Sequence, residues 1–271
     1  MKIIACFFST LFVVAFAVAQ QFAPAANGPQ VMVLGGLTSD TTATHGFVYH
    51  EVIRGGEFVR GAPYTGIAAT DTTQVLADGN RIINHSVAHL ARDSEGRTRR
   101  EETVSNLGPL PTEASHLVFI TDPVARAEYV LNLDDHTAVV RKLEGTKIIS
   151  VEQKRDLETA GKPIQSPAPT ESHQDALGVD TIEGLPCDHM KLFEMIPAGT
   201  IGNDRPIVIT SETWASPDLH LLVIRKKNDP RFGVTIYKVT HIVRGEPDAS
   251  LFQVPRGFKV LENASTLPTS R

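Results

Sequence analysis

Short β-prone runs alternate with turn sequences along most of the chain, and this rhythm restricts the fold more than any other feature. A run over 65–76 meets the turn 77–80, a second run over 81–92 meets the turn 93–96, and a third run covers 97–105. Each turn contains a glycine beside an acidic residue, and glycine adopts the positive φ angles that tight hairpins require. The rhythm predicts a three-stranded antiparallel meander here.

The same alternation of strand and turn continues to the end of the chain. It predicts a mainly β fold (β-dominated α+β), with a large curved antiparallel sheet or half-barrel and few short helices, one of them over 151–160. The further predicted strands cover 116–121, 127–133, 137–143, 178–182, 187–195, 206–215, 219–227 and 233–243, and the last ordered piece covers 252–260.

The composition along the chain divides it into segments. Three prolines interrupt the strand pattern after residue 144, and proline cannot donate to a strand ladder. We expect a signal peptide (1–19), a low-complexity, partly ordered leader (20–59), a single β-rich domain (60–261) and a tail (262–271). The domain has two strand groups, 60–143 and 176–261, which a proline-containing linker (144–175) joins.

The first nineteen residues predict export from the cytoplasm. Lys2 precedes the apolar stretch 3–16, and the small residues Ala17 and Ala19 offer a cleavage pattern. The apolar stretch is too short for a transmembrane helix, which needs about 20 residues, so we expect no transmembrane segment in the mature protein. The predicted location is periplasmic or secreted.

The composition of the mature chain excludes several classes of protein. Loss of Cys6 with the signal leaves Cys187 as its cysteine, so no intramolecular disulfide is expected. The whole chain has 26 Lys and Arg against 31 Asp and Glu, and loss of Lys2 makes the balance still more acidic. An acidic surface repels phosphate backbones, and no nucleic-acid partner is expected.

Three stretches, 92–99, 178–189 and 211–255, resemble uncharacterised secreted proteins of soil bacteria. The ending, Phe252 and Pro255 followed by Gly257-Phe258, is similar to that of periplasmic half-barrel proteins related to lipoprotein carriers and lipoprotein sensors. This second resemblance implies a curved sheet wrapped around helices, with an apolar concavity for a lipid or a lipoprotein. It implies no catalytic residues.

Histidine and cysteine offer the most obvious candidates for chemistry. His85 and His89 share one face of a predicted strand, but they lie about 13 Å apart at ~3.3 Å per residue and cannot chelate one metal together. Cys187 and His189 are closer, and with a third ligand they could hold zinc or copper. A nucleophilic Cys187 would need a lowered pKa and a nearby base. We interpret Cys187 as an inert structural residue.

The charged run 92–102 alternates in sign around a predicted hairpin tip. Such runs are typical of a solvated edge that resists aggregation. The alternative is a docking surface for a protein partner, formed by Arg97, Arg99 and Arg100.

These observations favour an exported, non-enzymatic protein that binds a lipid or lipoprotein in an apolar concavity. The first alternative is an interaction or sensor module for envelope proteins, and the second is a metal-binding or hydrolytic enzyme built around Cys187 and His189. The sequence contains no Gly-x-Ser-x-Gly elbow and no phosphate-binding glycine loop. We assign no catalytic residue, no metal ligand and no cofactor.

Overall fold

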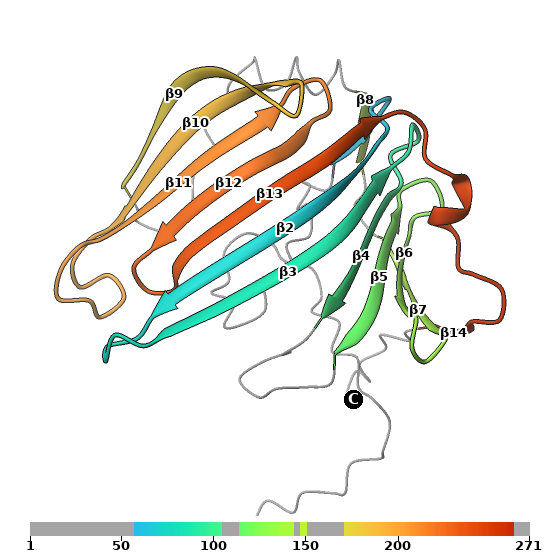
Figure 1. Cartoon of the computed structure of the whole chain (residues 1–271), viewed down its shortest axis with the longest axis horizontal. Coiled ribbons are helices and arrows are strands. Elements are labelled where there is room, and N and C mark those ends of the chain that lie inside the picture. Colours follow the sequence, from blue (N-terminus) through green and yellow to red (C-terminus); the bar gives the residue numbers. More distant parts are fainter. Residues whose placement is uncertain (1–56, 105–113, 144–146, 151–170, 263–271) are drawn as a thin grey trace, which may run out of the picture. The chain divides into compact units, whose positions relative to one another are not determined.

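A computed structural model describes residues 57–104, 114–143, 147–150 and 171–262 (Figure 1). These residues form strands and one 3-10 helix, with the following bounds: β1 (Glu57–Arg60), β2 (Tyr64–Val75), β3 (Arg81–Arg92), β4 (Thr98–Val104), β5 (Ser115–Asp122), β6 (Ala127–Asn132), β7 (Thr137–Lys142), β8 (Lys147–Ser150), β9 (Glu171–Ile182), β10 (Leu185–Ile196), β11 (Ile207–Ser216), β12 (Leu221–Asp229), β13 (Gly233–Arg244), η2 (Ala249–Phe252) and β14 (Lys259–Glu262).

One large curved sheet contains twelve of these strands (Figure 1). Their order is β14-β7-β6-β5-β4-β3-β2-β13-β12-β11-β10-β9. All neighbours are antiparallel except β14 and β7, which are parallel. Strands β1 and β8 form a separate parallel pair. The predicted fold, a large curved antiparallel sheet, is confirmed.

Strands β2 and β13 join two meanders in the middle of this sheet, side by side although far apart in the chain (Figure 1). The register pairs Thr73 with Val234 and Tyr64 with Arg244. At Gly233 the backbones approach so closely that a Cβ atom would lie 2.1 Å from the carbonyl oxygen of Thr73. Gly233 also has a φ of 95°, a value that glycine adopts without strain. The central seam therefore depends on this glycine.

The two faces of the sheet differ in burial because side chains alternate along each strand. We name face A after the cross-strand row of Ile67, His89, Glu101, Val118, Leu131 and Ala138. Face B is the opposite face, and β2 presents the buried residues Tyr64, Ala68 and Thr70 on it. Face B of β2, β3 and β13 belongs to a hydrophobic cluster that includes Ala68, Ala88, Tyr237 and Val239.

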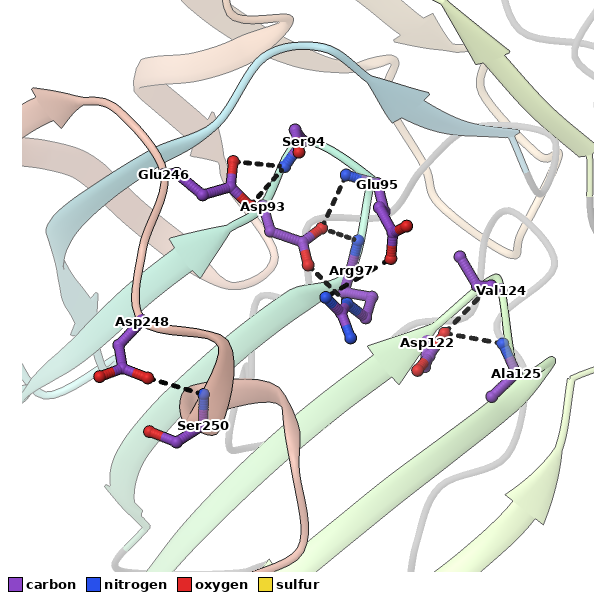
Figure 2. Close-up of polar contacts among 10 residues, drawn as sticks. All are labelled: Asp93, Ser94, Glu95, Arg97, Asp122, Val124, Ala125, Glu246, Asp248 and Ser250. Atoms are coloured by element: carbon purple, nitrogen blue, oxygen red, sulfur yellow. Dashed lines mark hydrogen bonds and ion pairs between the residues drawn. The ribbon is translucent and has the colours of Figure 1, made fainter.

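A second hydrophobic cluster lies on face A at the other end of the sheet. Its buried residues are Ala91, Val118, Ile120, Leu131, Ala138 and Phe252. Phe252 is the last residue of η2, whose first turn is capped by the carboxylate of Asp248, an acceptor for the backbone N–H of Ser250 at 2.8 Å (Figure 2). The segment after η2 adds Val254 and Phe258 to the cluster. The C-terminal segment thus covers this part of face A.

Most predicted strands begin and end within three residues of the observed ones, and the run 81–92 coincides with β3. Strand β9 is longer than predicted, since it begins at Glu171, and β8 lies in the predicted linker 144–175. The last ordered piece, predicted over 252–260, runs from the end of η2 at Phe252 into β14, which begins at Lys259.

Some predictions fall on other parts of the chain. The signal peptide 1–19, most of the leader 20–59, the short helix 151–160 and nearly all of the tail 262–271 lie outside the described residues. The described ranges contain no helix that is long and apolar enough to cross a membrane.

Candidate functional site

A hollow of about 320 Å³ lies on face A, where β2, β3, β4 and the end of β13 approach η2. Its walls combine apolar and ionisable side chains. The lining residues are Thr65, Gly66, Ile67, His89, Leu90, Ala91, Arg99, Glu101, His241 and Leu251. This volume is at the lower end of the range of about 300–1,000 Å³ that small-molecule sites occupy.

Strand β4 supplies an ion pair to the wall of this hollow. The Nη2 group of Arg99 donates to Glu101 Oε2 at 2.6 Å, and its Nη1 group donates to the carbonyl oxygen of Leu251 at 2.9 Å. Nε2 of His116 lies 3.0 Å from the other carboxylate oxygen, Oε1. Burial alone would raise the pKa of Glu101, but the contacts with Arg99 and His116 outweigh it and lower the pKa. Glu101 is therefore an ionised, doubly engaged carboxylate.

A bulge in β13 places His241 at the rim. The register of β13 against β2 shifts between Thr240 and Val243, and His241 has a φ of 53°. The backbone N–H of His241 donates to the carboxylate of Glu183 at 3.0 Å, and its ring Nδ1 lies 3.1 Å from Thr240 Oγ1. Bulges commonly re-aim one side chain in this way. His89 enters from β3, directly opposite Glu101 in the register.

Exposed aliphatic side chains continue from the hollow along face A. We call the set formed by Val75, Ile83, Val87, Val234 and Ile236 the aliphatic patch. These side chains are 39% to 63% exposed, and they come from the neighbouring strands β3, β2 and β13. Val87 is one face-A position from His89 along β3, so the patch begins where the hollow ends. The ion pair between Asp71 and His85, at 2.6 Å, lies among the aliphatic groups.

A third group of side chains surrounds His189 on β10. The His189 ring stacks on Trp214 of β11 with a centroid separation of 4.0 Å, and the two residues are direct cross-strand partners. Oδ2 of Asp180 accepts from the Trp214 indole N–H at 2.7 Å and lies 3.2 Å from Nδ1 of His189. Sequence reasoning missed Asp180. The residues Glu183-Gly184, which follow the predicted strand 178–182, are typical of a two-residue hairpin turn, and such a turn places Asp180 opposite Cys187.

Cys187 lies in the hydrophobic core and is fully buried. Its thiol contacts the carbonyl oxygen of Leu185 at 3.6 Å, and burial raises its pKa. A nucleophilic cysteine needs the opposite shift, since the thiolate is the reactive form. Within the part of the chain that the structure describes, no group of three His, Cys, Asp or Glu residues could hold a metal ion.

The charged run 92–102 is largely buried, and the prediction of a solvated edge was wrong. Arg92, Asp93, Arg100 and Glu102 are each at most 7% exposed. Oδ1 of Asp93 accepts from the backbone N–H groups of Glu95 and Arg97, at 3.0 and 2.8 Å, and so shapes the hairpin tip (Figure 2).

Neighbouring contacts fix the same tip. The backbone N–H of Ser94 donates to Glu246 at 3.1 Å, and Asp122 organises the adjacent turn by accepting from Val124 and Ala125 (Figure 2). The arginines proposed for docking, Arg97, Arg99 and Arg100, each form an ion pair within the chain. The docking alternative thereby loses its free cations.

The sequence matches no protein-family model and no curated protein. Among solved structures, it is similar to an uncharacterised conserved protein from Thermus thermophilus (8% identity, 74% of this chain and 90% of that chain, TM-score 0.40). LprF from Mycobacterium bovis gives 14% identity, 73% and 90% coverage and a TM-score of 0.34. A LolA superfamily protein from Nitrosomonas europaea is 8% identical, with 72% of this chain and 92% of that chain covered and a TM-score of 0.30. A LolA superfamily protein and a putative outer membrane lipoprotein-sorting protein domain are among the similar solved structures, in agreement with the weak resemblance predicted from the sequence.

Proposed function

We propose that this chain is an exported, non-enzymatic protein that binds the apolar chain of a lipid or lipoprotein. The observation that carries the proposal is the continuity of the hollow with the aliphatic patch on face A. The ligand occupies the hollow, and its apolar chain lies over the patch. The signal-like residues 1–19 support the export part of the proposal.

The patch favours binding because the free energy falls when its exposed aliphatic groups are transferred out of water. Full burial of a Val or Ile side chain is worth roughly 1.5–3 kcal/mol. The five patch residues are about half exposed, so their burial supplies on the order of 5 kcal/mol. Association itself costs at least about 4 kcal/mol. The patch alone therefore gives weak binding, and useful affinity requires the hollow as well.

The structure supports a binding role more than a catalytic one. Cys187, the one nucleophile singled out from the sequence, is buried among apolar residues and has a raised pKa. The ionised Glu101 is held by Arg99 and His116, so it is poorly suited to take up a proton.

A fluorescent fatty acid, cis-parinaric acid, tests this proposal. The purified chain should enhance the fluorescence of the probe at micromolar concentrations, and mass spectrometry of the untreated protein should detect a bound lipid. The double variant Val87→Ser/Ile236→Ser should weaken binding about tenfold, by roughly 1.4 kcal/mol. Val179→Ser is the matched control, because Val179 is 65% exposed on β9 and outside the patch. A wild-type chain that leaves the probe unbound would refute the proposal.

A further inference from the structure

We infer that the hollow selects amphiphiles with an anionic head group, a carboxylate or a phosphate, which His89, His241 and Arg99 hold. The inference rests on the proposed function and adds the chemistry of the polar end of the ligand.

The first step is the state of Glu101, the carboxylate that lines the hollow; the Glu183 carboxylate at the rim accepts from the backbone N–H of His241 at 3.0 Å. Both oxygens of Glu101 are engaged, Oε2 by Arg99 and Oε1 by His116. The charge of Glu101 is balanced by Arg99, and the lowered pKa of Glu101 keeps that balance at neutral pH. A cationic head group would have to displace one of these contacts, so it has no ready partner in the hollow.

The second step is the supply of donors. The bonds from Arg99 to Glu101 and Leu251 use two of the five N–H donors of a guanidinium. Across the described part of the chain, the His89 ring has no hydrogen-bond partner, and the His241 ring contacts only Thr240, through Nδ1. Each imidazole can donate an N–H. The wall therefore offers unused N–H donors to an incoming anion.

The third step is the arrangement of the polar and apolar groups. The order on face A of β3 is His89, Val87, His85 and Ile83, and His85 is paired with Asp71. The rise of ~3.3 Å per residue puts Ile83 about 20 Å from His89. A ligand with its anion between His89 and His241 would lay its chain toward Ile83. The hollow and the patch are thus the two ends of one amphiphile site.

Four ligands with the same twelve-carbon chain test the inference by isothermal titration calorimetry on the full chain. They are dodecanoate, dodecyl phosphate, dodecanol and dodecyltrimethylammonium. Both anions should bind at least tenfold more tightly than dodecanol, and the cation should bind most weakly. The ratio of dodecyl phosphate to dodecanoate then shows which anion the site prefers.

Variants locate the selectivity. The double variant His89→Leu/His241→Leu should abolish the tenfold preference for the anions over dodecanol and leave the affinity for dodecanol within about twofold of the wild-type value. His173→Leu, on the distant strand β9 and 73% exposed, should change neither the preference nor the affinity for dodecanol. If the leucine pair melts at a lower temperature than wild type, the milder pair His89→Gln/His241→Gln makes the same comparison.

The outcomes separate the two proposals. Dodecanol binding as tightly as dodecanoate would overturn the inference and leave the proposed function standing. Binding of none of the four ligands would overturn both. An anion preference that survives in both histidine pairs would also overturn the inference.

Discussion

Strand β4 carries an arginine–glutamate pair on each face, and the buried pair gives a sharp test of the electrostatics. Arg99 and Glu101 face the hollow, and Arg100 and Glu102 lie on face B, where their side chains are 8% and 3% exposed. We consider three variants: Glu102→Leu, Arg100→Met, and the two together. Each single change leaves a buried charge without its partner, and the double change removes both charges.

The magnitudes come from the geometry of the pair. Nη2 of Arg100 lies 2.8 Å from Glu102 Oε2, and at an effective dielectric constant of about 20 the attraction is about 6 kcal/mol. Opposing it is the loss of hydration, which costs several kcal/mol per ion. Within the described residues, Arg100 Nε and Glu102 Oε1 also lack partners, which costs about 1–3 kcal/mol each. Since gain and cost are similar, the pair contributes little net stability.

Each single variant should therefore lose about 3–5 kcal/mol of unfolding free energy, and the double variant should lie within about 1 kcal/mol of wild type or above it. Urea unfolding followed by the fluorescence of Trp214, the one tryptophan of the chain, measures these values. Two outcomes would refute the reasoning: a double variant that loses the sum of the two single losses, or single variants that lose less than about 1 kcal/mol.

Three further predictions concern other sites. Gly233→Ala should lower the melting temperature measured by circular dichroism, with a loss of more than about 1–3 kcal/mol, because the new Cβ would clash with Thr73 at a φ of 95°; an unchanged melting temperature would contradict the close approach of β2 and β13. Cys187 should react slowly with a thiol reagent in the native protein and at least tenfold faster in urea, since burial raises its pKa and hides it; rapid labelling of the native chain would show that the thiol is accessible. Burial tends to raise the pKa of Asp229, but the bonds with Arg231 lower this pKa overall. The ionised carboxylate therefore stabilises the folded state at pH 7, and this contribution is lost as the pH falls below the ordinary Asp pKa of about 3.9. Asp229→Asn should thus cost about 1–3 kcal/mol at pH 7 and progressively less below pH 4, and a difference that grows on acidification would reverse the assigned sign.

Local patterns predicted most of the strands because each strand and its turn lie close together in the sequence. The run 81–92 has a glycine-containing turn at each end, and β3 occupies those residues. By contrast, the first half of β9 has no such pattern. Residues 171–175 are polar and almost all exposed, since β9 is the last strand in the order of the described sheet. An edge strand with no buried face needs no apolar alternation, and periodicity cannot detect it.

The hollow was predictable only in part. The predicted turn 93–96 brings β3 beside β4, but four turn residues would place His89 opposite Arg100, whereas the structure places it opposite Glu101. No turn was predicted between 105 and 116, so the pairing of Glu101 with Val118 had no signal in the sequence. The position of His241 depends on the bulge after Thr240 and on the pairing of β13 with β2, strands that are more than 150 residues apart. The burial of Arg100 and Glu102 was also missed, because the charged run 92–102 was interpreted from its composition rather than from the two faces of β4.

The seam between β2 and β13 has a consequence for the synthesis of the chain. The strands β2–β7 can pair as they emerge, but the open edge of β2 waits for residues 233–244, which come after more than half of the chain has followed. Until then a twelve-residue strand presents unpaired N–H and C=O groups, the usual template for association with other chains. A chain that terminates before Gly233 would therefore keep this central edge open, and completion of β13 closes it.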